Sequence, residues 1–520
     1  MTANPQHYPL FPVGRAGSLF FLLLAGVLLA RPLAAAVPAL EQVPCWFESG
    51  SGWPETTCFF MHVNEDHGNP QSARIRFPVV KFEGGSNDRP VLDLGGGGPG
   101  FPSGLGAEDI EEWIWYRYSY MFQRFDRDLY VIDPRGVGMA EPALGCFEAL
   151  AIVRPLWARH LSVGEEYAEV TRSYERCGQR LRAEGYDLLK YNSAAVATDI
   201  KQLGEQLGIG QFSLYGASYA SRYALTIARD YPEMVASMVL DGPVFPSVRS
   251  EDYMIRNGTR AIHRALYACT TDEACRLDFP DIEQRFWKLV DALNTKPMAL
   301  SVTDPVNYAR LAVTLTGDRF YDVVFYTLYD EKNHASLPEL IVSMEFGNTD
   351  LVAALVRNYL ALLLDDSIAD ATINSHYCFE EFPFELSADL EVPQDAPAFL
   401  VKREAQLTPL KRSACASWLP TLQLSTREGE AVKTAIPTLI LSGELDPVIP
   451  IEDIDRVLPN FTNVVYYSVS DVAHGVVAVN SCAERIAGAF YEFGMEYNRQ
   501  ERCARSEQSM VLRYRATAPQ

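Results

Sequence analysis

Short apolar segments alternate with helical segments through the middle of this 520-residue chain, and the alternation limits the folds open to it. The apolar segments are predicted to be strands at 90–94, 128–133, 211–215, 238–241, 438–442 and 463–467. Between them, 194–207 and 218–231 repeat apolar residues with a helical period. Apolar runs of this length between helices are typical of a parallel sheet covered on both faces. We therefore predict an α/β fold.

The stretch 244–430 breaks the alternation. Its apolar residues recur mostly with helical spacing, as at 281–293, 337–344 and 350–364. We predict that it forms a helical lid inserted into one α/β core. The predicted divisions are a first core part at 37–243, the lid at 244–430 and a C-terminal core part at 431–520.

The first 36 residues have the pattern of a signal peptide. An apolar run at 17–30 follows a polar start whose only charge is Arg15, and it is shorter than the roughly 20 residues of a membrane span. The small residues Ala34, Ala35 and Ala36 then supply a cleavage site. We predict export to the periplasm or the medium, without stable membrane insertion.

Charge and composition exclude several partners. Lys and Arg total 45 against 67 Asp and Glu, so the net charge is −22, and no basic run offsets it. Nucleic acid is therefore not an expected partner, and an anionic membrane surface would repel the chain. The oligomeric state is not visible in the sequence.

The chain has ten cysteines, none in a CxxC pair, so the sequence predicts neither a metal site nor another cofactor. In an oxidising compartment, disulfides are the expected state. Sequence alone allows many pairings, with one or two free thiols as the alternative. Sequential neighbours close loops at the least entropic cost. That pairing gives 45–58, 146–177, 269–275, 378–415 and 482–503.

One turn carries the predicted chemistry. Ser218 stands in Gly-Ala-Ser-Tyr-Ala at 216–220, between a predicted strand and a predicted helix. This is the context of a nucleophile elbow, in which a strained turn presents a serine hydroxyl at the edge of the sheet. Ala220 replaces the glycine that usually ends this motif. We predict that Ser218 is a nucleophile.

A serine nucleophile needs a base and an orienting carboxylate. In folds with a nucleophile elbow, both follow the serine along the chain, first the acid and then the histidine. His474 is the histidine that follows the late strands, and Asp446 follows the strand before it. Glu444 and Asp471 are the competing acids. We predict the triad Ser218, Asp446 and His474.

A tetrahedral intermediate needs donors for its oxyanion. We expect one from the backbone N–H of Tyr219 and one from the glycine-rich loop at 95–100, at Gly98. A phosphate cradle is the other use of such a loop. However, the loop has no GxGxxG or GK[ST] spacing, and Pro99 removes a donor.

These motifs together resemble the exported serine aminopeptidases of the α/β-hydrolase fold, the proline iminopeptidase and tripeptidyl aminopeptidase group. The matching segments are Gly97-Gly98-Pro99-Gly100, Asp133-Pro134-Arg135-Gly136-Val137-Gly138, Gly216-Ala217-Ser218-Tyr219, Leu240-Asp241-Gly242, Ser442-Gly443-Glu444-Leu445-Asp446-Pro447, His474-Gly475, and the lid segments that begin at Cys378 and Cys415. Gly96 stands where cytosolic members have a histidine.

The resemblance implies cleavage of short peptides that have a free N-terminus. A lid carboxylate would bind the substrate ammonium, and Glu380 and Glu381 are the candidates. Alternatively, the two carboxylates bind no substrate and are simply solvated beside a disulfide. We expect Arg135 to pair with a buried carboxylate and to brace the glycine-rich loop. A carboxylesterase with the same triad and a non-catalytic binding protein on a hydrolase scaffold are the alternative functions.

Overall fold

The computed structural model describes residues 39–496 except 51, 87, 107–109, 111–126, 249, 382–391 and 422–426. The described residues all belong to one compact unit, Pro38–Gln520. The predicted signal peptide at 1–36 and the predicted bond partner Cys503 lie outside the described residues. No helix in the described part is both long enough and apolar enough to span a bilayer.

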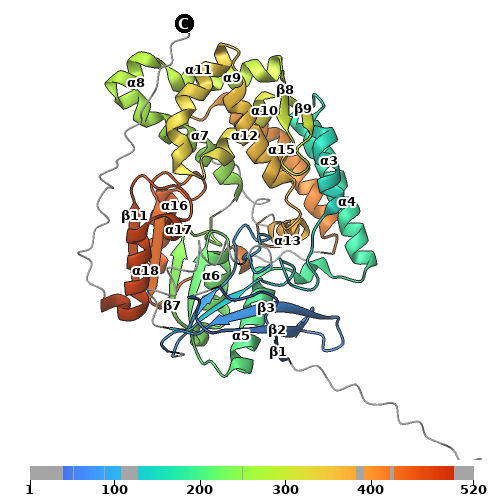
Figure 1. Ribbon diagram of the computed structural model, residues 1–520, viewed down its shortest axis with the longest axis vertical. Coiled ribbons are helices and arrows are strands. Elements are labelled where there is room, and N and C mark those ends of the chain that lie inside the picture. The colour runs from blue at the N-terminus through green and yellow to red at the C-terminus, as the bar shows by residue number, and fades with distance from the viewer. Residues whose placement is uncertain are drawn as a thin grey trace, which may run out of the picture. The chain divides into compact units, whose positions relative to one another are not determined.

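Within the described residues, nine strands form one sheet in the order β1-β2-β3-β5-β4-β6-β7-β10-β11 (Figure 1). The strands are β1 (Leu40–Val43), β2 (Thr56–Asn64), β3 (Arg74–Phe82), β4 (Val91–Asp93), β5 (Leu129–Ile132), β6 (Phe212–Ala217), β7 (Val235–Asp241), β10 (Thr438–Gly443) and β11 (Val464–Val469). Neighbours from β5 to β11 pair in parallel, whereas β1, β2, β3 and β5 pair antiparallel in that order. The predicted mostly parallel sheet is confirmed.

All six predicted strands are present, and β1, β2 and β3 are additional. These three escape an apolar-run search because polar residues interrupt them. His62 lies in β2, and Arg76, Pro78 and Lys81 lie in β3. Alternating apolar and polar residues are typical of antiparallel strands near a sheet edge.

Helices cover both faces of the sheet, as predicted. Successive residues of a strand point to opposite faces. In β6, Leu214 packs into the cluster that contains α5 (Ser193–Leu207) and α6 (Ala220–Asp230). Its neighbour Tyr215 packs into a second cluster with α18 (Ser481–Phe493).

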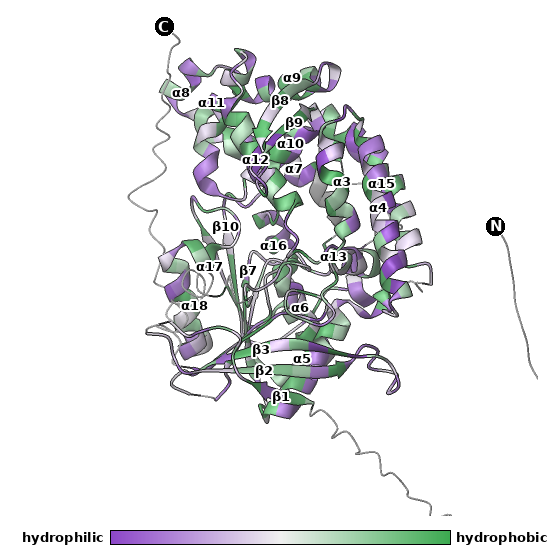
Figure 2. Cartoon of the chain, turned by 45° about the vertical axis from the view of Figure 1, so that its right-hand side comes forward, coloured by the Kyte–Doolittle hydropathy of each residue, from purple (hydrophilic) through white to green (hydrophobic). Residues whose placement is uncertain are grey.

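A cap with its own hydrophobic cluster carries most of the remaining helices. Its main elements are α7 (Ser250–Thr271), α8 (Glu273–Asp278), α9 (Ile282–Thr295), β8 (Met298–Thr303), β9 (Arg310–Leu315), α10 (Gly317–Thr327), α11 (Leu337–Glu345), α12 (Asp350–Leu363), α13 (Asp370–His376) and α15 (Ala398–Trp418). Figure 2 shows hydrophilic and hydrophobic residues alternating along these helices, as expected where one face of each is buried.

The cap also takes in two helices from the stretch assigned to the core, α3 (Phe147–Trp157) and α4 (Val163–Ala183). Trp157 belongs to the cap's hydrophobic cluster, and α4 packs beside α15 (Figures 1 and 2). Arg319 of α10 donates to the carbonyl oxygens of Leu156 and Trp157 at 2.9 and 3.1 Å. The division at 243 and 244 therefore leaves out the first part of the cap.

Four of the five predicted disulfides are confirmed, namely 45–58, 146–177, 269–275 and 378–415. Cys482 is also disulfide-bonded. The described part contains no free cysteine. Disulfides at these positions are compatible with an oxidising compartment.

Candidate active site

Ser218 occupies the tight turn between β6 and α6. Its φ of 54° lies in the left-handed region that side-chain-bearing residues rarely adopt. The turn is held by the Ser218 N–H, which donates to Asp241 O at 2.8 Å, and by the Ser221 N–H, which donates to Ser218 O at 3.1 Å. A Cβ at Gly216 would lie 2.7 Å from the Ser221 backbone, so only glycine fits there. The fully buried Ala220 keeps its methyl group within this packing.

His474 and Asp446 follow β11 and β10 and form a hydrogen-bonded pair. The distance from His474 Nδ1 to Asp446 Oδ2 is 2.7 Å. The other carboxylate oxygen of Asp446 accepts from the N–H groups of Val448 and Ile449 at 2.8 and 2.9 Å. Burial lowers the pKa of His474, but the negative charge and hydrogen bond of Asp446 outweigh it, so the pKa lies above its usual value. Asp446, rather than Glu444, is the carboxylate that orients this imidazole.

The Ser218 turn and the Asp446–His474 pair both lie at the carboxyl ends of parallel strands. Gly242, which follows β7, lies beside the pair. A Cβ at this glycine would lie 3.1 Å from His474 Cε1 and 3.3 Å from Asp446 Oδ2. The preceding residue, Asp241, accepts from the Ser218 N–H. This edge is where ligands bind in open α/β sheets.

Asp241 supports the histidine loop, a role that sequence analysis did not assign. Its carboxylate oxygens accept from the N–H groups of Val476 and Val477 at 2.8 and 2.9 Å, directly after His474 and Gly475. Burial raises the pKa of Asp241, and these backbone donors oppose that effect. Its position in the Leu-Asp-Gly segment at the end of β7 is the sequence feature that could have identified it.

The glycine-rich loop lies against the serine turn, with Gly97 nearest to it. A Cβ at Gly97 would lie 3.1 Å from Ser218 Cβ and 3.5 Å from Tyr219 N. Gly98, the predicted oxyanion donor, is one residue farther along, and its missing side chain faces the ring of Phe101. Tyr219 precedes α6, so its N–H lies at the end of that helix where amides lack helical partners.

Asp133 anchors the segment that follows the glycine-rich loop. It accepts from the Ser103 N–H at 2.7 Å and from the Met139 N–H at 2.9 Å. Ser103 Oγ also donates to Ile132 O at 2.6 Å. The loop is therefore fixed to the end of β5.

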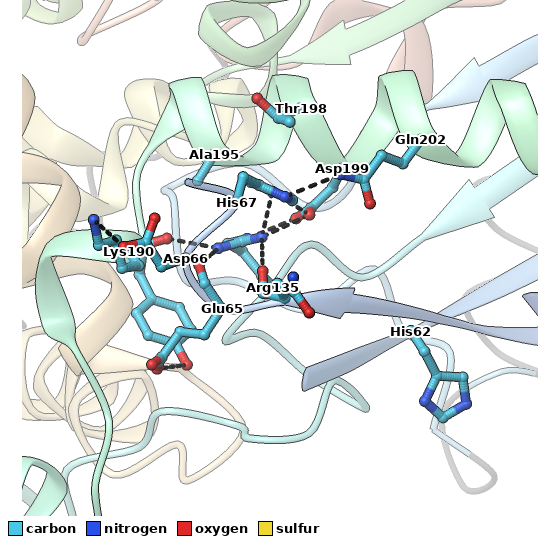
Figure 3. A network of polar contacts seen from close by, with 12 residues as sticks. His62, Glu65, Asp66, His67, Arg135, Lys190, Ala195, Thr198, Asp199 and Gln202 are labelled. Carbon is cyan, nitrogen blue, oxygen red and sulfur yellow. Dashed lines mark hydrogen bonds and ion pairs between the residues drawn. The ribbon is translucent and has the colours of Figure 1, made fainter. Parts of the chain in front are cut away.

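Arg135 pairs with a buried carboxylate, as expected, but it braces a different loop (Figure 3). Its guanidinium donates to both carboxylate oxygens of Asp199 at 2.6 Å. It also donates to the carbonyls of Glu65 and Lys190 at 2.7 and 2.9 Å, and His67 lies 2.9 Å from Asp199. The network ties the β2–β3 loop to α5, and Asp133 takes the bracing role predicted for Arg135.

Glu380 is fully buried, and its carboxylate is used inside the protein. Its oxygens accept from the Ser193 N–H, from Ser193 Oγ at 2.7 Å, from Tyr219 Oη at 2.9 Å and from Arg222 Nε at 2.7 Å. Burial raises the pKa of Glu380, but the Arg222 charge and the hydrogen bonds from Ser193 act with other nearby groups to outweigh burial, so the pKa lies below its usual value. These four donors match the lone-pair sites of a carboxylate and leave none for a substrate ammonium. Glu381 lies 3.9 Å from Arg222 and is partly exposed.

A buried polar cluster extends from Glu380 to the glycine-rich loop. Tyr223 Oη donates to Pro99 O at 3.2 Å and lies 3.3 Å from His376 Nε2. The ring of His376 also packs edge-on against the ring of Tyr219, with centroids 5.8 Å apart. Burial lowers the pKa of His376, which keeps this imidazole neutral. The cluster thus joins the serine turn, the glycine-rich loop and α13 of the cap.

Cap helix α7 holds the loop that carries Asp446. Three arginines spaced four residues apart contact this loop and the helix after it, namely Arg256, Arg260 and Arg264. Arg260 donates to Asp446 O at 2.6 Å, and Arg264 donates to the carbonyl of Glu444. Arg256 pairs with Asp453 at 2.7 Å. Burial and the neighbouring Arg264 lower the pKa of Arg260 to about 10.

The fold and the turn define the class of protein. Residues 97–277 match the alpha/beta hydrolase fold family. The chain has the alpha/beta hydrolase fold, and it is a hydrolase of that class. Residues 404–503 match a second family, described as TAP-like protein. Within the described residues, no group of three or more His, Cys, Asp or Glu side chains could hold a metal ion.

Curated relatives match the chain at low identity. "Putative hydrolase YuaR" of Escherichia coli (strain K12) is 21% identical over 462 residues, which cover 82% of this chain and 89% of that protein. "Serine protease Hip1" of Mycobacterium tuberculosis is 24% identical over 454 residues, with 80% and 82% covered. "Carboxylesterase B" of the same organism is 25% identical over 489 residues, with 84% and 88% covered. A solved alpha/beta hydrolase fold protein from Chitinophaga pinensis covers 85% of this chain and 98% of its own at 12% identity and a TM-score of 0.35.

Proposed function

We propose that this protein is an exported serine aminopeptidase that releases a single residue or a short fragment from the N-terminus of peptides. The proposal is supported by the strained Ser218 turn and by the Asp446–His474 hydrogen bond, which both lie at the carboxyl ends of parallel strands. The TAP-like match and the serine protease relative support peptides as the substrate class.

In the proposed reaction, neutral His474 takes the proton of Ser218 Oγ as the serine attacks the scissile carbonyl carbon. Amide groups of Tyr219 and of the glycine-rich loop, at Gly97 or Gly98, stabilise the oxyanion. His474, oriented by Asp446, then protonates the leaving amine. Water then attacks the acyl-enzyme while His474 takes its proton, and His474 returns that proton to Ser218 Oγ as the fragment is released.

Of the two acidic lid residues, Glu381 is the one that we propose binds the substrate ammonium. Glu380, bonded to Arg222, Tyr219 and Ser193, is instead proposed to position the serine turn. If hydrolysis of free-amine peptides is unchanged in Glu381→Gln, the assignment of Glu381 fails.

A carboxylesterase is the second candidate, and it is favoured by the relative of that name. The proposed triad serves esters and amides alike, so substrate competition has to separate the two functions. A non-catalytic binding protein is the third candidate, and in that case no serine of the chain should be reactive.

The test has two stages. A fluorophosphonate probe should label the mature protein, and Ser218→Ala should abolish the labelling, whereas Ser301→Ala, at an exposed serine of β8, is the control and should keep it. One short peptide, free and N-acetylated, is then incubated with the enzyme, and its products are measured by mass spectrometry. Cleavage of the free form alone supports an aminopeptidase, and equal cleavage of both forms contradicts it. Labelling without cleavage of either form indicates an esterase, and absence of labelling indicates a binding protein.

A further inference from the structure

A cavity of about 400 Å³ lies within the cap, between α3, α4, α12, α13 and α15. This volume is within the range of small-ligand sites. Most of its wall is apolar or aromatic, and the aromatic side chains are Phe101, Trp157, Tyr167, Tyr174 and Tyr359. Figure 1 shows α3, α4 and α15 side by side at one side of the cap.

The charged groups of the wall are predominantly acidic. The carboxylates are Glu166, Asp318, Asp322, Asp365 and Asp370, and the cations are Arg319 and Arg403. Three ion pairs involve these two cations. Arg319 lies 2.9 Å from Glu166, and Arg403 lies 2.8 Å from Asp322 and 3.7 Å from Asp318. Asp365 is exposed and accepts from Ser367.

Asp370 differs from the other wall carboxylates. It accepts from Tyr174 Oη at 3.2 Å, and none of the described Lys, Arg or His side chains forms an ion pair with it. Burial raises its pKa to about 6, so the carboxyl is ionised at neutral pH. An ionised carboxylate in a mostly apolar wall is stabilised by an added cation, because burial without a counter-ion is costly.

The cavity lies directly behind the glycine-rich loop. The N–H of Ala369, which precedes Asp370, donates to Gly100 O at 2.9 Å. A Cβ at Gly100 would lie 2.7 Å from Ile373 of the cavity wall, and Phe101 of the same wall packs on Gly98. The opposite side of this loop faces Ser218 through Gly97. A ligand in the cavity is therefore separated from the serine turn by one loop.

We propose that this cavity is a subsite for a cationic group of the peptide substrate, with Asp370 as its counter-ion and the aromatic wall around its apolar part. The inference rests on the proposed peptidase function and names the substrate feature that the cap selects. The cation is a lysine or arginine side chain, because the amino-terminal ammonium is assigned to Glu381 in the proposed function. The acidic wall disfavours a carboxylate or a phosphate, so a peptide cation fits this cavity better than an anionic ligand does.

The test measures binding to the full mature chain carrying Ser218→Ala, so that no substrate is consumed. Calorimetry compares four forms of one short peptide, with a free or acetylated N-terminus and with lysine or norleucine at one position. Loss of affinity on replacing lysine with norleucine supports the subsite, whereas loss on acetylation alone contradicts it. Adding Asp370→Asn should weaken binding of the cationic form at least tenfold and remove its advantage over the neutral form. Asp366→Asn, on the exposed loop before α13, is the matched control and should keep that advantage.

If Asp370→Asn retains the preference for the cationic peptide, the subsite is overturned. Should Asp370→Asn fail to fold, Leu363→Trp provides a second test, because a larger side chain in the wall fills the cavity and should cause the same loss. Fluorophosphonate labelling of the unmutated chain is measured in parallel. Labelling without Asp370-dependent binding would overturn the subsite alone, and Asp370-dependent binding without labelling would overturn the proposed catalysis alone.

Discussion

The His474–Asp446 pair sets the pH range in which the proposed base works. His474 must be neutral to accept a proton, and the pKa of its imidazole lies above the ordinary 6.5 because Asp446 and Asp241 face it. We therefore predict that kcat/KM rises with pH, with a midpoint above 6.5. The other ring near His474 is Tyr329, at a centroid distance of 5.4 Å; burial raises its pKa, so it stays neutral there.

Asp446→Asn tests this assignment. Removing the anion should lower the pKa of His474, shift the acid limb of the pH–rate profile to lower pH and reduce kcat by about 10⁴-fold. Glu444→Gln is the matched control and should keep the wild-type midpoint. An Asp446→Asn profile with an unchanged midpoint would contradict the assignment.

Glu380 and Glu381 are adjacent but should respond differently to substitution. Glu380→Gln leaves the buried Arg222 without its close counter-ion, and breaking a buried pair costs about 3–5 kcal/mol. Because the folded-state pKa of Glu380 is lowered, its contribution to stability is present above the unfolded-state pKa and is lost as pH falls. Glu381→Gln should cost less than about 1 kcal/mol. Denaturant unfolding of both variants measures the difference, and equal losses would count against the proposed role.

At the residue scale, sequence was enough for residues that directly follow strands. Ser218, Asp446 and His474 each lie just past an apolar run, so the local pattern placed them after strands, and the structure pairs Asp446 with His474. The surroundings of Glu380 could not be predicted, because its partner Arg222 is 158 residues away in the chain. Spacing gave no reason to favour Gly97 over Gly98 either, since the choice depends on the path of the loop against the serine turn.

Among the elements, α7 offers a test of how the cap supports the proposed chemistry. Arg260→Met removes the donor to Asp446 O, and hydrogen bonds that involve charged groups contribute about 1.5–3 kcal/mol. We predict a decrease in kcat of about 10-fold to 100-fold with little change in KM, because the loop loses its fixed geometry rather than a substrate contact.

Arg276→Met on the exposed part of α8 is the matched control for Arg260→Met. Arg260→Lys should recover part of the loss. The pH–rate profile is a further readout, because a misplaced Asp446 carboxylate should lower the midpoint set by His474. A change in KM alone would show that Arg260 does not act through the acid loop.

Element types were predictable where burial on both faces produced apolar runs, as in β4, β6 and β10. Strands β2 and β3 were not, because polar residues and Pro78 interrupt their apolar residues. The sequence also showed no sign that α3 and α4 belong to the cap. Helical periodicity identifies a buried face but does not say which element covers it.

For the whole molecule, the disulfides provide a graded stability test. Replacing Cys378 and Cys415 with serine opens a link across 37 residues and should lower the unfolding free energy by about 3–4 kcal/mol. The same change at Cys269 and Cys275, six residues apart, should cost about 2 kcal/mol. Denaturant titration of both double variants measures the two losses. A larger loss for the shorter loop would contradict the loop-entropy explanation.

The two-part origin of the cap has a consequence for engineering. Because α3 and α4 precede β6 while α7 to α15 follow β7, the cap is built from two separate stretches of the sequence. A chimera that grafts only the longer insertion would keep the host's own segment in place of α3 and α4, and would expose the surface that Trp157 covers here. Exchange of specificity between hydrolases of this design therefore requires both insertions to be transplanted together.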